Sequence, residues 1–160
     1  LSKPIGTGLA LAGGSDADKA AAIAGMRRLN RAASEELQSL GAAVHAVTDV
    51  TGYGLAGHGW EVAERSGLRV VVDTDGIVAY PGAREAAERG VRTGGDRRNR
   101  DYVAAVVEST ASPEGEALCY DPQTSGGLLA AVDPAAAGAF GDGWWRVGSV
   151  EAGQPGIVLR

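Results

Sequence analysis

The feature that most constrains the fold is a strand, glycine turn and helix in direct succession. An alternating apolar run at 43–50 leads into the closely spaced glycines of "TGYGLAGHG", and a helical pattern then continues to about Ser66. A second apolar run at 68–74 follows, and its consecutive valines predict a strand buried on both faces. Strands that alternate with helices in this way predict a layered α/β fold, a mixed β-sheet covered by helices.

The remaining pattern predicts about six strands and four or five helices in total. Further strands are expected from glycine-containing or alternating apolar runs, at 5–13, around Cys119, and at 127–132, 144–150 and 156–160. Further helices are expected from three- and four-residue apolar spacing or from a leading proline, at 15–40, 81–90, 102–108 and 134–140. The segment 91–101 is expected to be a loop.

Length, charge and cysteine content limit the class of protein. A chain of 160 residues has room for one compact domain with a sizeable core. Its net charge of −5 gives no overall attraction for nucleic acid or for an anionic membrane, so we expect neither as a partner. The single cysteine, Cys119, cannot close a disulfide within the chain, and a reducing cytoplasm is the expected compartment. No apolar run approaches the roughly 20 residues of a membrane span.

The glycine turn matches the dinucleotide-binding fingerprint through Gly52, Gly54 and Gly57, with Asp73 near the end of the next strand. In that fingerprint the strand runs directly into the first glycine, whereas four residues that include Asp49 intervene here. An ionised carboxylate at this position would repel a pyrophosphate unless a cation stood between them. A dinucleotide site is therefore the less favoured interpretation, and the phosphate-binding pattern G-x-x-x-x-G-K-[ST] is absent.

Asp49 has two interpretations at this stage. Asp49 and Thr51 can simply satisfy free backbone N–H groups at a strand-to-helix turn. Alternatively, Asp49 is a Mg²⁺ ligand, because Mg²⁺ takes one or two carboxylates together with substrate phosphates and water. A single aspartate would then be part of a metal site and not the whole of it.

Three stretches, in this order and spacing, resemble the C-terminal half of selenophosphate synthetases, also called selenide, water dikinases: "TDVTGYGLAGH" (48–58), "GGDRRN" (94–99) and "DPQTSGGLL" (121–129). The segments "KPIGTGLALAG" (3–13) and "MRRLN" (26–30) resemble the first strand and first helix of the same half. The resemblance implies a single PurM-like C-terminal domain over 1–160. It also implies an N-terminal domain, missing here, that carries most ATP contacts, the dimer contacts, and the reactive cysteine or selenocysteine with its lysine.

The resemblance places the family's Mg²⁺-binding aspartate on Asp49, with Tyr53 in place of the usual phenylalanine. The complete enzyme of this family, a homodimer, is expected to convert ATP, selenide and water to selenophosphate, AMP and phosphate. No catalytic residue is expected in this chain, which by itself should be inactive; neither Cys119 nor Lys3 is assigned such a role. Because the chain does not begin with methionine, we expect it to be a fragment.

Several further residues are candidates for the walls of the ATP and phosphate cleft. They lie on the glycine turn, on the 94–99 stretch and on the 121–129 stretch: Thr51, Gly52, Gly54, Asn99, Thr124, Ser125, Gly126 and Gly127. For the turn at 124–127, a purely structural role and a role as backbone donors to a ligand are equally open.

Other polar residues near these stretches are left outside the site. His45 and His58 are expected to pack or to form hydrogen bonds, because no second ligand stands at metal-binding spacing. The arginines between 84 and 101 are expected to form a solvated basic surface more readily than an anion site. Thr93 and Asp96 replace the family's usual proline and threonine, which leaves the role of the 92–100 segment open.

Two other functions stay in consideration. The chain could belong to another PurM-like ATP-dependent synthetase or kinase, although the "DPQTSGG" stretch would then be an unusual coincidence. It could also be a non-catalytic binding module of the same fold. The coding sequence upstream would separate these alternatives from a selenophosphate synthetase, because a glycine-rich segment with cysteine or selenocysteine, lysine and several aspartates supports the selenophosphate synthetase.

Overall fold

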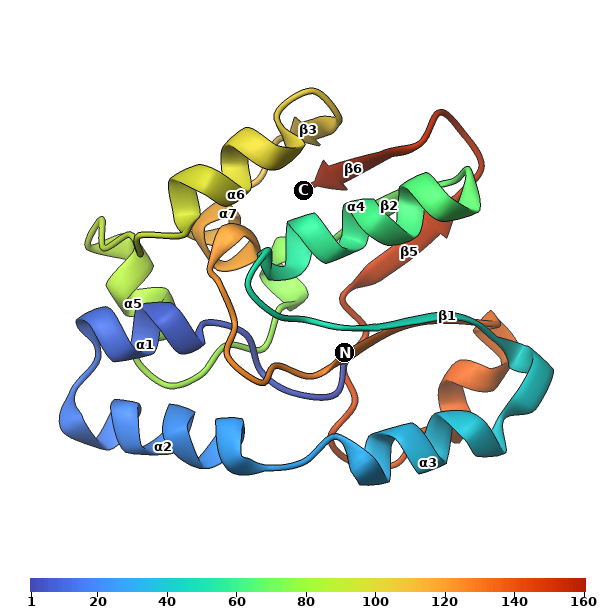
Figure 1. Ribbon diagram of the computed structural model, residues 1–160, viewed down its shortest axis with the longest axis horizontal. Coiled ribbons are helices and arrows are strands. Elements are labelled where there is room, and N and C mark those ends of the chain that lie inside the picture. Colours follow the sequence, from blue (N-terminus) through green and yellow to red (C-terminus); the bar gives the residue numbers. More distant parts are fainter.

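The computed structural model describes residues 1–160 and is shown in Figure 1. Its α-helices are α1 (Thr7–Gly13), α2 (Asp16–Arg27), α3 (Arg31–Ser39), α4 (Gly54–Ser66), α5 (Ala83–Glu88), α6 (Asp96–Val103) and α7 (Pro113–Tyr120). Short 3₁₀ turns are η1 (Gly41–Ala43), η2 (Thr74–Gly76) and η3 (Pro134–Ala139). The strands are β1 (Val44–Asp49), β2 (Arg69–Val72), β3 (Val107–Ser109), β4 (Leu128–Val132), β5 (Gly148–Glu151) and β6 (Gly156–Leu159). None of the helices is long and apolar enough to cross a membrane.

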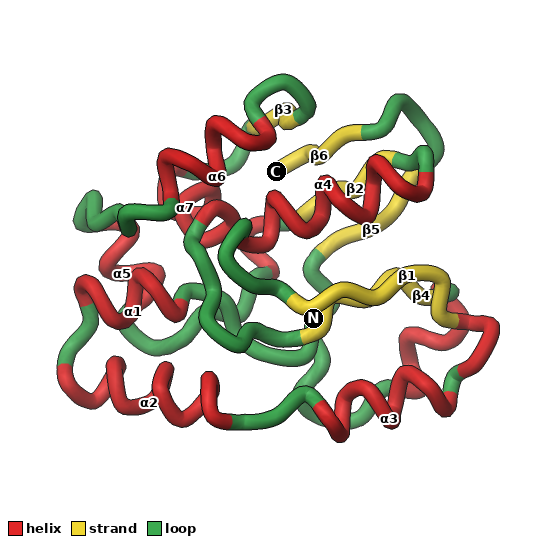
Figure 2. The backbone as a smooth tube through the Cα atoms, in the orientation of Figure 1, coloured by secondary structure: helices red, strands yellow, loops and turns green.

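The strands form two sheets (Figure 2). The larger has the order β3-β6-β2-β5, in which β6 is parallel to both of its neighbours and β5 is antiparallel to β2. The smaller is an antiparallel ribbon of β1 and β4, in which Asp49 is paired with Leu128. The predicted mixed sheet covered by helices is therefore confirmed, with β1 and β4 forming a ribbon of their own.

Helix α4 covers one face of the larger sheet and is packed tightly against it. Val70, Val72, Ile157 and Leu159 from that face belong to the main hydrophobic core. A Cβ added at Gly59 would lie 2.7 Å from Ile157 Cδ1, so glycine is what allows this close approach. Because α4 is held in this way, the turn that precedes it has a defined position on the molecule.

The prediction of a strand at 5–13 was wrong, because the chain there forms helix α1. The first backbone N–H groups of a helix need acceptors, and Gly6 at the N-cap supplies no side chain. The distant Gln123 Oε1 accepts from the N–H groups of Gly6 and Thr7, both at 3.1 Å. Asp121 Oδ2 accepts from Gly8 N–H at 2.9 Å. Residues far away in sequence therefore cap this short helix.

The predicted single helix at 15–40 is interrupted at 28–30, where side chains form hydrogen bonds to distant segments of the chain. The guanidinium of Arg28 donates to Ser2 O at 2.9 Å, and Asn30 Nδ2 donates to Gly126 O at 2.8 Å. These long-range contacts separate α2 from α3, although the apolar spacing continues across the break.

Two further predictions around α6 and α7 were wrong. The expected strand around Cys119 is helix α7, which has Pro113 in its first turn and Ser112 as N-cap, with its side chain accepting from Gly115 N–H at 3.2 Å. The expected loop at 91–101 and helix at 102–108 are replaced by α6, which starts at Asp96, and by β3.

Candidate functional site

Two loops from distant parts of the sequence run side by side at the candidate site. Val50 N–H donates to Gly127 O at 2.9 Å, and Gln123 N–H donates to Thr51 O at 2.9 Å. These bonds continue the pairing of β1 with β4 beyond the ends of both strands. The fold therefore brings the glycine turn and the "DPQTSGG" stretch together, as the candidate site requires.

Asp49 is an exposed carboxylate at the end of β1. Nearby, Gly52 is partly exposed and a Cβ added there would meet no atom within 4 Å, so the turn is open at this position. No group of three or more His, Cys, Asp or Glu side chains that could hold a metal gathers anywhere in the chain. Asp49 thus fits as one protein ligand of a Mg²⁺ ion that keeps water and phosphate oxygens, and it does not fit as a complete metal site.

The 124–127 turn has an exposed half and a buried half. Thr124 and Ser125 are exposed, and Ser125 has a positive φ of 49°, which few non-glycine residues adopt. Gly126 and Gly127 are buried, and a Cβ at Gly127 would lie 2.5 Å from Lys3 N. The two glycines therefore serve close backbone packing, whereas Thr124 and Ser125 are the residues of this turn that a ligand could reach.

The buried side chain of Asn99 forms hydrogen bonds that link the glycine turn to the end of α7. Its side chain is completely buried, and Nδ2 donates to Gly52 O at 2.8 Å and to Tyr120 O at 2.9 Å. Gly54 is also buried and its φ is +70°. A Cβ added at Gly54 would lie only 2.7 Å from Cys119 O. Both residues shape the turn, and a direct contact of either with a ligand stays a prediction.

A hydrogen-bonded chain beside Asp49 was missed by the sequence reasoning. Thr51 Oγ1 lies 3.0 Å from His58 Nε2, and His58 Nδ1 lies 2.9 Å from Glu61 Oε2. His58 is therefore a hydrogen-bonding residue, as expected, but its partner is a candidate cleft residue. The three-residue spacing of His58 and Glu61 on α4 was the available signal. His45 lies on the exposed side of β1 and pairs with Asp133 at 2.8 Å.

The arginine-rich segment is largely helical and engaged in structural contacts. Arg100 donates to Asp96 Oδ1 at 2.9 Å and to Glu116 Oε2 at 2.6 Å, and its guanidinium lies 4.3 Å from the centre of the Tyr120 ring. Asp96 is buried and anchors this arginine at the start of α6. Arg97, by contrast, is nearly fully exposed. The segment therefore joins α6 to α7 and has an outer solvated rim.

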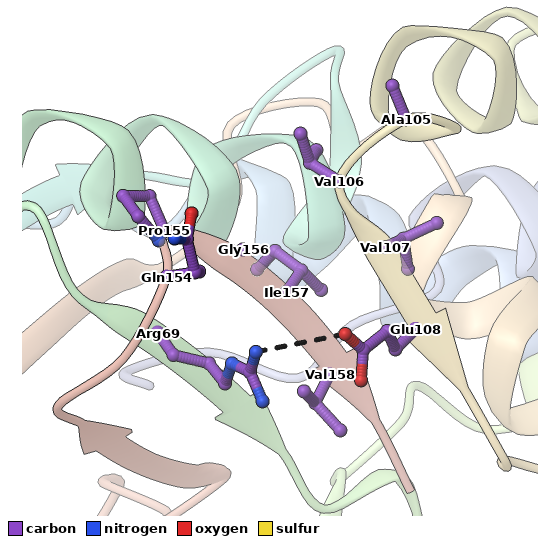
Figure 3. A pocket seen from close by; sticks show the side chains of 10 residues that line it. All are labelled: Arg69, Ala105, Val106, Val107, Glu108, Gln154, Pro155, Gly156, Ile157 and Val158. Carbon is purple, nitrogen blue, oxygen red and sulfur yellow. Dashed lines mark ion pairs between the residues drawn. The ribbon is translucent and has the colours of Figure 1, made fainter.

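Two grooves on the chain lie away from Asp49. One groove of about 250 Å³ follows the edge of the larger sheet, where Arg69 on β2 pairs with Glu108 on β3 across β6 (Figure 3). A second, polar groove lies between the start of α2 and the start of α5. Neither groove includes a candidate site residue.

Asp121, which begins the "DPQTSGG" stretch, makes stability depend on pH. Burial raises the pKa of Asp121 from 3.8 to about 6, against the opposing effect of hydrogen bonds such as that from Gly8 N–H. The folded protein therefore binds this proton more tightly than the unfolded chain does. The contribution of Asp121 to the free energy of unfolding is most favourable below about pH 4, and falls by up to about 3 kcal/mol as the pH rises through and beyond 6.

We expect Asp121→Asn to remove this pH dependence. Urea denaturation of the wild type and the variant between pH 4 and pH 7 should give a difference in unfolding free energy that changes across this window. Parallel stability curves for the two proteins would show that Asp121 does not titrate there.

Comparison with known proteins places this arrangement in a family. Residues 6–159 match the family model described as AIR synthase related protein, C-terminal domain. The chain is 36% identical over 167 residues to selenide, water dikinase 2 of Peptoclostridium acidaminophilum, covering 99% of this chain and 47% of that protein. It is 44% identical over 112 residues to selenide, water dikinase of Caldanaerobacter subterraneus subsp. tengcongensis, covering 69% of this chain and 32% of that protein. The chain thus spans about half or less of the curated relatives it matches.

Solved structures of low sequence identity share the fold. Thiamine monophosphate kinase from Aquifex aeolicus superposes with a TM-score of 0.65 at 15% identity, over 99% of this chain and 48% of that one. Hydrogenase maturation protein HypE superposes with a TM-score of 0.60 at 18% identity, over 99% of this chain and 47% of that one. These likenesses confirm the predicted PurM-like fold. By its sequence match over almost its whole length, the chain belongs to the AIR synthase related proteins, as their C-terminal domain.

Proposed function

We propose that residues 1–160 form the C-terminal domain of a selenide, water dikinase, which makes selenophosphate from selenide, ATP and water and releases AMP and phosphate. The proposal is supported by curated relatives of that name, matched over nearly the whole chain. The chain covers 47 to 49% of the length of these three relatives. We also propose that an N-terminal domain carries most of the ATP contacts. The full-length protein would form a homodimer mainly through that domain.

The observation that carries the proposal is the position of Asp49 beside the open glycine turn. An exposed carboxylate next to unobstructed backbone suits a Mg²⁺ ion shared between this domain and the phosphates of ATP. Bound there, the ion would neutralise phosphate charge during transfer. Asp49 would be the ligand from this chain, while Thr51, Gly52, Thr124 and Ser125 would form the adjoining wall of the cleft.

The nucleophile and the remaining metal ligands are proposed to lie in the N-terminal domain. Cys119 is fully buried, and burial raises the pKa of its thiol to about 12, so it is not available as a thiolate near neutral pH. Lys3 is buried as well, and its Nζ donates to the backbone oxygens of Arg28 and Ser125. Neither residue is placed to attack a substrate, which agrees with a chain that supplies half of an active site.

Reconstitution from two halves tests the proposed function. The purified chain is expected to produce no AMP from Mg²⁺–ATP and selenide, because phosphoryl transfer needs several charges around the polyphosphate and this domain offers one carboxylate there. Adding the matching N-terminal half in trans is expected to restore production of AMP and of selenophosphate, followed by ³¹P NMR.

The same reconstitution with Asp49→Asn in this chain is the matched control, and it should remain inactive. Turnover of ATP by the isolated chain, unchanged by Asp49→Asn, would place a complete active site within these residues and contradict the proposal. So would an intact full-length protein that consumes ATP without dependence on selenide.

A further inference from the structure

Thr51, His58 and Glu61 form one hydrogen-bonded chain that ends at the candidate cleft. Thr51 Oγ1 and His58 Nε2 are 3.0 Å apart, and His58 Nδ1 and Glu61 Oε2 are 2.9 Å apart. The side chain of His58 is 8% exposed and that of Glu61 is 33% exposed. Thr51 is partly exposed and follows Asp49 by two residues. Thr51 is therefore the end of the hydrogen-bonded chain that adjoins the candidate site in sequence.

The partners of the imidazole determine which way the Thr51 hydroxyl points. A carboxylate can only accept hydrogen bonds, so the contact with Glu61 favours the tautomer of His58 with its proton on Nδ1. Nε2 is then an acceptor, and the Thr51 hydroxyl donates its proton to it. The oxygen lone pairs of Thr51 remain for a group in the cleft, and such a group must be a hydrogen-bond donor.

The surroundings hold the three residues in place. The carbonyl oxygen of Thr51 accepts from Gln123 N–H at 2.9 Å and from Gly54 N–H at 3.0 Å, which fixes the backbone of the turn. The Tyr53 ring lies edge-on to the imidazole, with ring centres 6.0 Å apart and planes at 72°. Both ring nitrogens of His58 are already paired within the chain, so His58 has no direct access to a substrate.

A phosphoryl transfer to water needs a group that accepts a hydrogen bond from that water. A donor group, such as a backbone N–H, would instead draw on the oxygen lone pairs that must attack phosphorus. Of the candidate cleft residues, Thr51 is the one whose hydroxyl contacts a buried imidazole, and the tautomer of His58 inferred above directs the hydroxyl proton to that imidazole. Its oxygen can hold a water molecule by one O–H bond and leave a lone pair of the water free.

We propose, on the basis of the proposed function, that Thr51 positions the water molecule that receives a phosphoryl group in the dikinase reaction. His58 and Glu61 act as positioning residues that keep the Thr51 hydroxyl in this orientation. In this transfer to water, the water oxygen forms a new bond to phosphorus and the bond between that phosphoryl group and AMP breaks. One proton of the water is released to solvent. Phosphate and AMP are the products.

The nucleotide product provides a readout that separates this role from a general loss of structure. A protein that transfers one phosphoryl group to selenide but fails with water leaves ADP in place of AMP. In the full-length protein with Mg²⁺–ATP and selenide, we expect Thr51→Val to slow AMP formation about tenfold, as for the loss of one hydrogen bond, and to accumulate ADP. Thr51→Ser, which keeps the hydroxyl, is expected to restore AMP as the main nucleotide product.

His58→Gln and Glu61→Gln are expected to raise the ADP-to-AMP ratio in the same direction, and by less than Thr51→Val does. His45→Gln is the matched control, because His45 also pairs with a carboxylate, on an exposed strand and without a hydroxyl partner. Its nucleotide products should equal those of the wild type. Thermal unfolding of each variant is measured alongside, so that a change in product ratio is compared at equal folded fraction.

Two results would overturn the inference alone. One is a Thr51→Val protein that still produces AMP and ADP in the wild-type ratio. The other is a Thr51→Val protein that loses selenide-dependent turnover and AMP formation to the same extent, with no ADP. A wild-type protein that forms no AMP in the presence of selenide would instead overturn the proposed function, and this inference with it.

Discussion

Replacing Asp49 by Asn in the full-length protein is expected to lower Mg²⁺-dependent AMP formation on the order of a hundredfold. The amide is nearly isosteric with the carboxylate, but it lacks the negative charge that binds a hard cation. Because Asp49 is exposed and its side chain makes no hydrogen bond within the chain, the thermal unfolding midpoint should hardly change. The initial rate of AMP formation across a Mg²⁺ titration is the measurement, and part of the loss should be recovered at high Mg²⁺.

Asp142→Asn is the matched control for this experiment. Asp142 is an exposed aspartate in the segment between η3 and β5, and forms no ion pair with the rest of the chain. Its replacement changes the net charge by the same amount and should leave the Mg²⁺ titration unaltered. Activity of the Asp49→Asn protein within about twofold of wild type at limiting Mg²⁺ would rule out the metal assignment.

Replacing Gln123 by Leu is expected to lower the free energy of unfolding of the chain by about 4 kcal/mol, because several buried donors lose their acceptor at once. Gln123 Oε1 accepts from Gly6 N–H, from Thr7 N–H and from the Thr7 hydroxyl at 3.1 to 3.2 Å. Its Nε2 also donates to Asp121 O at 2.8 Å. Leucine is similar in size and satisfies none of these groups. Urea denaturation monitored by circular dichroism measures the change.

Gln38→Leu on the exposed face of α3 makes the same chemical change away from this network. Its effect on stability should stay within about 0.5 kcal/mol, which is typical of surface substitutions. A loss below about 1 kcal/mol for Gln123→Leu would mean that water replaces the carboxamide at the start of α1. The capping explanation for this helix would then be wrong.

The strand, glycine turn and helix at 43–67 could be predicted because their signals are local. Alternation of exposed and partly buried residues along β1 follows directly from the two-residue period of a strand. Gly67 ends α4 in the left-handed conformation, as the sequence indicated. The valines of β2 are buried as their consecutive apolar pattern predicted. In each case, neighbouring residues carry the information that decides the structure.

The element at 5–13 could not be predicted in this way, because the acceptors for its first backbone N–H groups come from elsewhere in the chain. The helix around Cys119, by contrast, has local start signals in Ser112 and Pro113, and the prediction of a strand there did not use them. Helix α1 depends on acceptors from Gln123 and Asp121, more than a hundred residues away. Without those acceptors, a glycine-containing apolar run is as compatible with a strand as with a helix. The break between α2 and α3 likewise depends on Asn30 and its contact with Gly126.

For the candidate site, the sequence by itself determined the chemistry, namely one aspartate at the end of a strand, a glycine turn and the "DPQTSGG" stretch that carries the family resemblance. Only the tertiary structure decided which of these residues face outward. The fold buries Gly126, Gly127 and Asn99, and leaves Asp49, Thr124 and Ser125 exposed. It also places Thr51 against His58 and Glu61. The local sequence fixes which chemical groups are present at the candidate site. Their exposure and their hydrogen-bond partners depend on contacts that form only when distant segments pack together.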